Sequence, residues 1–345
     1  MTRTLCSGTP ARRPRAKTGL GLAVLALFSL LSAACATSGN PAIKEITVGG
    51  PVAKESGAQQ STIRITLIMK TLTNPFFVEM EKGARTAQRE THIDLQVKTA
   101  TQETSIEQQI QLVEDEIKAK AKAIVIAPGD SSRLVPVLGK AQSAGICIVN
   151  IDNHLNPEAI RAAGMKPVPF ISVDNEKGAF LATKFVVDGI RSPTEAALIE
   201  GIRTADNARL RKLGAERGFH SNPNLKIVAE ETANWKIDEA FRVARKLFKS
   251  HPRIGVLFCA NDMMAIGVIK YLQETGRTGV KVIGFDDLEE ARAAIRAGLM
   301  AVTVNQQADR QGYLGVMTAL KLLQGDRPPA EIEVDTRLVT QGTLK

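Results

Sequence analysis

Short apolar runs alternate with longer amphipathic stretches from residue 63 almost to the C-terminus. Ten runs of four to seven residues, rich in β-branched side chains, predict strands. They lie at residues 63–69, 95–99, 123–128, 147–152, 170–174, 197–201, 226–230, 256–262, 280–286 and 301–304. Continuous apolar strands separated by helices are typical of parallel sheets that are buried on both faces. The pattern therefore predicts a doubly wound α/β fold, and some 285 residues favour two domains over one.

The first 60 residues do not share this pattern. Residues 1–35 combine a basic stretch with an uncharged apolar run, 19–31, which is too short to span a bilayer. The run is followed by SAAC, ending at Cys35, which resembles a bacterial lipoprotein signal peptide with its lipid-accepting cysteine. An ordinary secretory signal followed by an unrelated cysteine is the alternative. Either signal exports the protein, and residues 36–60 are expected to form a flexible tether.

Charge and cysteine usage narrow the possible functions. The chain carries a net charge of +9, and removal of residues 1–35 leaves 40 basic and 36 acidic residues. These are interspersed, whereas a nucleic-acid partner requires a concentrated basic face. Cys147 and Cys259 lie inside apolar runs and are expected to be buried, and the four histidines lack metal-ligand spacing. We therefore expect no nucleic-acid partner, no metal and no reliance on disulfides.

Polar or aromatic side chains follow several predicted strands, at the edge where open α/β sheets bind ligands. Turns and helix caps also require Asp and Asn, which would explain any one position but explains the whole set less well. The positions are Lys70, Asn74, Phe76, Phe77, Asp152, Asn153, Asn261, Asp262, Asp286, Asp287, Asn305 and Gln306.

Aromatic residues are scarce, with 14 in 345, yet Phe76 and Phe77 are adjacent after an Asn-Pro. Neighbouring helix positions point about 100° apart, so both rings cannot face one core stripe. Two core-edge aromatics in a first helical turn are the alternative on this stretch alone. Trp235, in the polar stretch TANWKID, is either a plug over the core or a wall for ligand stacking. A further polar stretch, RTADNARLR, carries Arg209 at the start of a helix.

These candidate residues supply carboxylates, amides, an arginine and three aromatic rings, with no histidine, nucleophile pair or metal cluster. Such a set recognises a ligand and does not transform it. A sugar matches it, because buried hydroxyls need hydrogen-bond partners while the C–H faces of the ring pack on aromatic side chains. A missing or inverted hydroxyl leaves a buried group unpaired, which costs roughly 1–3 kcal/mol.

Seven stretches, in order, carry a family resemblance: KTLTNPFF, CIVNIDN, ADNARLR, ANWKID, FCANDMMAIG, VIGFD and AVTVNQ. From about residue 61 to the C-terminus the chain resembles the periplasmic sugar-binding proteins of the ribose-binding type, which are type I periplasmic binding proteins. Within them it is most similar to the D-allose-binding members. The resemblance implies two Rossmann-like domains, joined by three hinge crossovers, that close on a pentose or hexose without enzymatic activity or a cofactor.

The resemblance also implies roles for individual residues. Ring stacking falls on Phe76, Phe77 and Trp235, and Lys70 matches a lysine of the allose-binding members. Hydroxyl binding falls on Asn74, Asp152, Arg209, Asn261, Asp286 and Gln306. Asn153 completes the expected ligand-binding set, although relatives carry Arg or an acid there, and Ala127 stands where the ribose binders have Asn. These two differences leave the identity of the sugar open.

Lobe boundaries and partners follow from the same resemblance. The N-terminal lobe is expected at residues 61–173 plus 307–335, and the C-terminal lobe at 174–306 plus 336–345. Hinges are expected near Asp174, Gln306 and Asp335. The implied partners are the permease and ATPase of an ABC importer. The protein is expected to be a monomer in the periplasm or at the cell surface, held to a membrane by a lipid on Cys35.

Three other classes of protein are the alternatives to a sugar-binding transport protein. A sugar-responsive repressor would need a DNA-reading helix-turn-helix where the export signal stands. An NAD-dependent enzyme would need a glycine-rich turn after an early strand, and the only G-x-G, at Gly19 and Gly21, lies in the signal segment. The remaining alternative is a sensory module, in which the same closed clamp contacts a chemoreceptor or sensor kinase.

Overall fold

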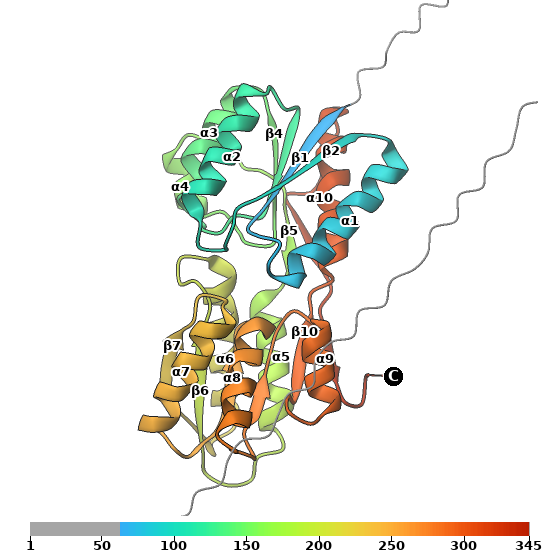
Figure 1. Ribbon diagram of the computed structural model, residues 1–345. Helices are drawn as coiled ribbons and strands as arrows, with labels where there is room; N and C mark the ends of the chain where they lie inside the picture. Colours follow the sequence, from blue (N-terminus) through green and yellow to red (C-terminus); the bar gives the residue numbers. More distant parts are fainter. Residues whose placement is uncertain (1–62, 345) are drawn as a thin grey trace, which may run out of the picture. The chain divides into compact units, whose positions relative to one another are not determined.

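A computed structural model describes residues 63–344, shown in Figure 1. The predicted signal peptide, the lipid-accepting Cys35 and the tether over residues 36–60 lie outside the described residues. No helix in the described range is long and apolar enough to cross a bilayer.

The first sheet has six strands in the order β11-β5-β4-β3-β1-β2, and every neighbouring pair is parallel. Its strands are β1 (Arg64–Met69), β2 (Asp94–Thr99), β3 (Ala123–Ile126), β4 (Cys147–Ile151), β5 (Phe170–Val173) and β11 (Glu331–Val334). Its helices are α1 (Pro75–Thr91), α2 (Ile106–Lys118), α3 (Val135–Ser143), α4 (Pro157–Ala162) and α10 (Ala308–Leu323). Helices α1 and α10 cover one face, and α2, α3 and α4 lie on the other (Figure 1).

The second sheet repeats this arrangement in the order β12-β10-β9-β8-β6-β7. Its strands are β6 (Thr194–Glu200), β7 (Leu225–Thr232), β8 (Ile254–Cys259), β9 (Lys281–Ile283), β10 (Val302–Asn305) and β12 (Arg337–Thr340). Its helices are α5 (Asn175–Val187), α6 (Asp206–His220), α7 (Ile237–Ser250), α8 (Asp262–Glu274) and α9 (Glu289–Arg296). Helices α5 and α6 cover one face, and α7, α8 and α9 the other. The predicted doubly wound α/β class is confirmed, with β12 as an antiparallel edge strand.

Burial on both faces explains the continuous apolar strands. All four residues of β3 are buried. Val125 packs in the cluster with α1 and α10, whereas its neighbours Ile124 and Ile126 pack in the cluster with α2 and α3. This alternation follows from the two-residue period of a strand. Cys259 is fully buried and Cys147 is partly exposed, and both thiols are free.

Glycines let α1 and α10 pack closely against each other. A Cβ on Gly83 would lie 1.7 Å from the carbonyl oxygen of Asp309, and one on Gly312 would lie 2.0 Å from that of Met80. No larger residue fits at either position without separating the helices. This contact matters for the site, because α1 begins with the Asn-Pro-Phe-Phe stretch.

The chain passes between the two sheets three times: after β5, after β10, and between β11 and β12. Strands β11 and β12 were not predicted, because EIEV and RLVT lie at sheet edges, mix exposed with buried positions and contain no continuous apolar run.

Candidate functional site

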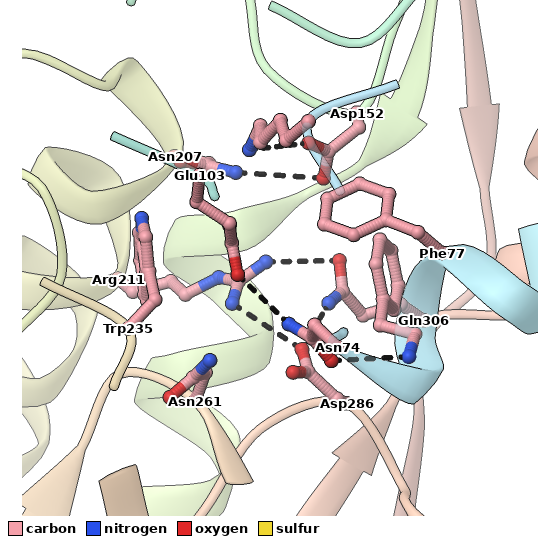
Figure 2. Close-up of a pocket in the computed structure, with 12 residues that line it drawn as sticks. Asn74, Phe77, Glu103, Asp152, Asn207, Arg211, Trp235, Asn261, Asp286 and Gln306 are labelled. Carbon is pink, nitrogen blue, oxygen red and sulfur yellow. Dashed lines mark hydrogen bonds and ion pairs between the residues drawn. The ribbon is translucent and has the colours of Figure 1, made fainter. Parts of the chain in front are cut away.

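A small cavity lies where loops from both sheets meet; its empty space, part of which is open to solvent, is about 230 Å³. The lining residues are Lys70, Asn74, Phe76, Phe77, Glu103, Asp152, Asn207, Arg211, Trp235, Asn261, Asp286 and Gln306 (Figure 2). Most of them stand just beyond the carboxyl ends of parallel strands or in the helix that follows, the edge at which open α/β sheets bind ligands.

A buried ion pair forms one side of the cavity. Lys70 follows β1, Asp152 follows β4, and the distance from the Lys70 Nζ to the Asp152 Oδ2 is 2.7 Å. Both side chains are almost fully buried. The ammonium group also lies 5.5 Å from the centroid of the Phe77 ring. Each charge is thus compensated by the other, and Asp152 keeps a second oxygen for other donors.

The Asn-Pro-Phe-Phe stretch forms the first turn of α1. The Oδ1 of Asn74 accepts a hydrogen bond from the backbone N–H of Phe76 at 3.1 Å, and Pro75 stands at the first helical position. The rings of Phe76 and Phe77 meet edge to face, with centroids 5.1 Å apart. Both rings line the cavity, and both are also buried members of the core. From the sequence alone, ligand stacking and a place at the edge of the core are alternatives for these rings, whereas both rings lie in the cavity wall and in the core.

Arg211 holds the opposite side together. Its Nε donates to Asn175 at 2.8 Å, its Nη1 to the backbone carbonyl of Ala260 at 2.8 Å, and its Nη2 to Gln306 at 2.9 Å. The guanidinium also lies 3.9 Å from the centroid of Phe285. Burial lowers the pKa of Arg211, and the neighbouring Asp286 opposes that shift. With three donors fixed by protein groups, the remaining N–H groups are held in place for a ligand.

Asp286 completes this cluster. Its Oδ1 lies 3.5 Å from the Nη1 of Arg211 and accepts a hydrogen bond from Gln306 Nε2 at 2.6 Å. Its backbone φ of 137° is a conformation that favours glycine, which indicates local strain. Burial raises the pKa of Asp286 well above its ordinary value, although Arg211 acts in the opposite direction. Strain and a shifted pKa at one cavity residue are typical of a functional position.

Trp235 and Asn261 close the cavity from the second sheet. Trp235 has a φ of 66° and is only 5% exposed. Within residues 63–344 its indole N–H has no hydrogen-bond partner. Asn261 caps α8 by accepting from the backbone N–H of Met264 at 2.9 Å, which leaves its amide N–H₂ free to donate. An unpartnered buried donor beside a cavity is expected where a ligand supplies the acceptor.

Two predicted ligand-binding residues do not line the cavity. Arg209 points away, its Nη2 lies 2.7 Å from Asp206, and its side chain is 57% exposed. Asn153 is fully buried, but its amide donates to the backbone carbonyl of Pro128 and to Ser131. The predicted ligand-binding roles of Arg209 and Asn153 are therefore corrected. Helix phase turns Arg209 outward, and the turn after β4 directs Asp152, but not Asn153, into the cavity.

Three lining residues were missed: Glu103, Asn207 and Arg211. A signal existed for Arg211, because it shares a helical face with Ala208 and Ala215 at spacings of three and four residues. Asn207 lies beside that face, and its Nδ2 is 3.5 Å from Asp152 Oδ1. Glu103 lies in the polar connection between β2 and α2, where no periodicity marks an inward position.

The cavity wall contains no histidine, cysteine or serine. Among the described residues, no cluster of three His, Cys, Asp or Glu side chains could hold a metal. The wall instead offers carboxyl oxygens, amide and guanidinium donors and three aromatic rings. This arrangement is suited to holding a small polar molecule that has some apolar surface.

Comparison with known proteins identifies the family. The protein-family model described as "Periplasmic binding protein domain" matches residues 65–327, which is most of the chain. The chain is a periplasmic binding protein. It is 38% identical over 284 residues to the D-ribose/D-allose-binding protein of Pseudomonas aeruginosa, covering 80% of this chain and 88% of that protein. It is 32% identical to the D-allose-binding periplasmic protein of Escherichia coli, covering 80% of this chain and 91% of the relative.

Solved structures agree with this assignment. A periplasmic solute-binding protein of an ABC transporter from Actinobacillus succinogenes, with bound D-allose, superimposes with a TM-score of 0.77 at 35% identity. The match covers 81% of this chain and 98% of that one. These relatives are transport-associated binding proteins, and this periplasmic binding protein is accordingly not an enzyme.

Proposed function

We propose that this protein binds a monosaccharide, a pentose or hexose, in the cavity and delivers it to an ABC importer. The observation that carries the proposal is the composition of the cavity wall. It combines two buried ion pairs with three aromatic rings around about 230 Å³. A buried pyranose or furanose would satisfy the donors and acceptors with its hydroxyls, while its C–H groups lie against Phe76, Phe77 and Trp235.

The proposed mechanism is closure of two lobes over the sugar. Sheet membership supports an N-terminal lobe of residues 61–173 plus 307–335 and a C-terminal lobe of 174–306 plus 336–345. The three chain crossings support hinges near Asp174, Gln306 and Asp335. The sugar favours the closed form because only there can residues of both lobes contact it.

Direct contacts between the lobes support this mechanism. The backbone N–H of Asp206 donates to Ser131 Oγ at 3.0 Å, and that of Asn207 donates to Asn153 Oδ1 at 3.1 Å. Asn153 is thus better explained as a contact of the closed form than as a sugar ligand. Its difference from relatives would then alter closure and not hydroxyl recognition.

The proposed partners are the permease and ATPase of an ABC transporter, which relatives of this kind serve. Export to the periplasm or cell surface is supported by the family and by the apolar run over residues 19–31. A lipid on Cys35 would hold the protein at a membrane, with residues 36–60 as its tether. We propose that it acts as a monomer, since one chain supplies the whole cavity wall.

Calorimetric titration of the protein with D-allose and D-ribose tests the proposal. The wild type is expected to bind at least one of these sugars, and Asp286→Ala is expected to abolish detectable binding because Arg211 loses its partner. Asp188→Ala is the matched control, since Asp188 is exposed and pairs with Lys184 on the surface. Unchanged affinity in Asp286→Ala would remove the site assignment, and a wild type that binds no pentose or hexose would remove the function.

A further inference from the structure

The charges around the cavity do not balance in pairs. Its wall carries three carboxylates, on Glu103, Asp152 and Asp286, but only two cations, on Lys70 and Arg211. Lys70 is paired with Asp152 at 2.7 Å, and Arg211 with Asp286 at 3.5 Å. Glu103 makes no ion pair with any residue between 63 and 344. The cavity thus holds one carboxylate in excess.

Glu103 is held at the boundary of the cavity by Asn74. Its Oε1 accepts from the Nδ2 of Asn74 at 3.0 Å, while the Oδ1 of Asn74 is occupied by the helix cap. Figure 2 shows the carboxylate of Glu103 directed toward Asn74 and Arg211. Glu103, Asn74 and Trp235 also border a second hollow, which Lys236 and others line on the outer side. The carboxylate therefore stands in the wall that separates the cavity from the outer hollow.

We propose that Glu103 determines specificity in this cavity by accepting a hydrogen bond from a ligand hydroxyl and by excluding anionic sugars. The inference rests on the proposed function and deepens it. It restricts the ligand to neutral polyhydroxylated compounds and excludes sugar acids and sugar phosphates.

The exclusion follows from the pairing of the cations. Once it is buried, an anionic ligand needs a positive charge that no protein carboxylate already compensates. Lys70 is already bound to Asp152, and three donors of Arg211 are directed at Asn175, Ala260 and Gln306. A ligand carboxylate or phosphate would add a negative charge beside the unpaired Glu103. Two like charges in contact repel each other more strongly where protein shields them from water.

Glu103 is expected to attract a ligand hydroxyl because its carboxylate makes no ion pair within residues 63–344. Burial raises the pKa of Glu103, and Lys70 and the hydrogen bond from Asn74 only partly offset it. Asp152 raises this pKa further, and Arg211 lowers it. A ligand hydroxyl that donates to Glu103 would stabilise its carboxylate form, since hydrogen bonds to charged groups are about twice as strong as neutral ones.

Calorimetry on the wild type, Glu103→Gln and Glu107→Gln tests the proposal. The neutral probes are D-allose and D-ribose, and the anionic probes are D-ribonate and D-ribose 5-phosphate. Glu107 is the matched control, because it lies four residues away, is exposed and pairs only with Arg133 on the surface. Thermal melting of the three proteins checks that each substitution leaves the fold intact.

Glu103→Gln is expected to weaken binding of the better neutral sugar by about tenfold, with no change in Glu107→Gln. The wild type is expected to bind either anionic probe at least 100-fold more weakly than that sugar. Equal neutral-sugar affinity in Glu103→Gln and the wild type would overturn the inference and leave the proposed function standing. So would an anionic probe that binds the wild type within tenfold of the neutral sugar. A wild type that binds neither neutral sugar would instead remove the proposed function, and this inference with it.

Discussion

Substitution of Arg211 by methionine should strongly destabilise the protein, whereas the same substitution at Arg209 should not. Both arginines lie in α6, two positions apart, but only the Arg211 side chain is buried. Methionine keeps most of the aliphatic volume and removes the guanidinium. In Arg211→Met, Asp286 therefore loses its cation, and Asn175 and the Ala260 carbonyl lose a donor.

The expected magnitude follows from this difference in burial. Removal of one partner from a buried ion pair costs about 3–5 kcal/mol, because the other charge stays buried and uncompensated. An exposed pair such as Arg209 with Asp206 contributes less than about 1 kcal/mol. For a folded part of this size, unfolding entropy near 0.6 kcal/mol per degree converts the larger loss to roughly 5–8 °C in melting temperature.

Calorimetric melting of both variants without ligand measures the difference, so the result does not depend on which sugar the protein binds. We expect a fall of at least about 5 °C for Arg211→Met and less than about 2 °C for Arg209→Met. Equal shifts in the two variants would refute the placement of Arg211 as the buried arginine of this helix.

Three further predictions concern other parts of the chain. Burial raises the pKa of Asp262 to about 6, so its ionisation should cost the native state up to roughly 3 kcal/mol as pH rises from about 4 to about 6. In urea melts the wild type should lose stability over this window relative to Asp262→Asn, and parallel pH profiles would contradict the assignment. Gly201→Ala places a Cβ 2.0 Å from the indole of Trp235, so it should weaken sugar binding at least about tenfold and shift the tryptophan emission. Gly139→Ala, with its nearest neighbour at 3.8 Å, should do neither. Cys35→Ser should release the protein from membranes into the soluble fraction, and continued anchoring in cell fractionation would defeat the lipoprotein hypothesis.

Much of the fold could be predicted because strands that are buried on both faces of a sheet are continuous apolar runs in the sequence. Strands such as β3 and β8 are uninterrupted apolar runs, and the end of β8 locates the loop that supplies Asn261 to the cavity. Strands β11 and β12 are short, lie at sheet edges and mix exposed with buried positions, so their composition gives no such signal. The parallel strands of the fold, including the edge strands β2 and β7, were therefore predictable, but β11 and β12 were not.

The site was predictable where a side chain follows a strand directly. Lys70 and Asp152 come immediately after β1 and β4, and the cap at Asn74 fixes the helix that presents Phe77. Prediction failed where the direction of a side chain depends on helix phase or on a loop. Arg211 lines the cavity because it lies on the buried face of α6. Glu103 lines it because its carboxylate accepts a hydrogen bond from Asn74.

The most direct test of the account is a crystal structure of the protein grown with the sugar that most raises its melting temperature. We expect one monosaccharide in the cavity, with its ring against Phe76, Phe77 and Trp235 and its hydroxyls within about 3.2 Å of Asp286 and Arg211. A sugar bound elsewhere, or a cavity that remains empty while the protein is saturated, would contradict the account.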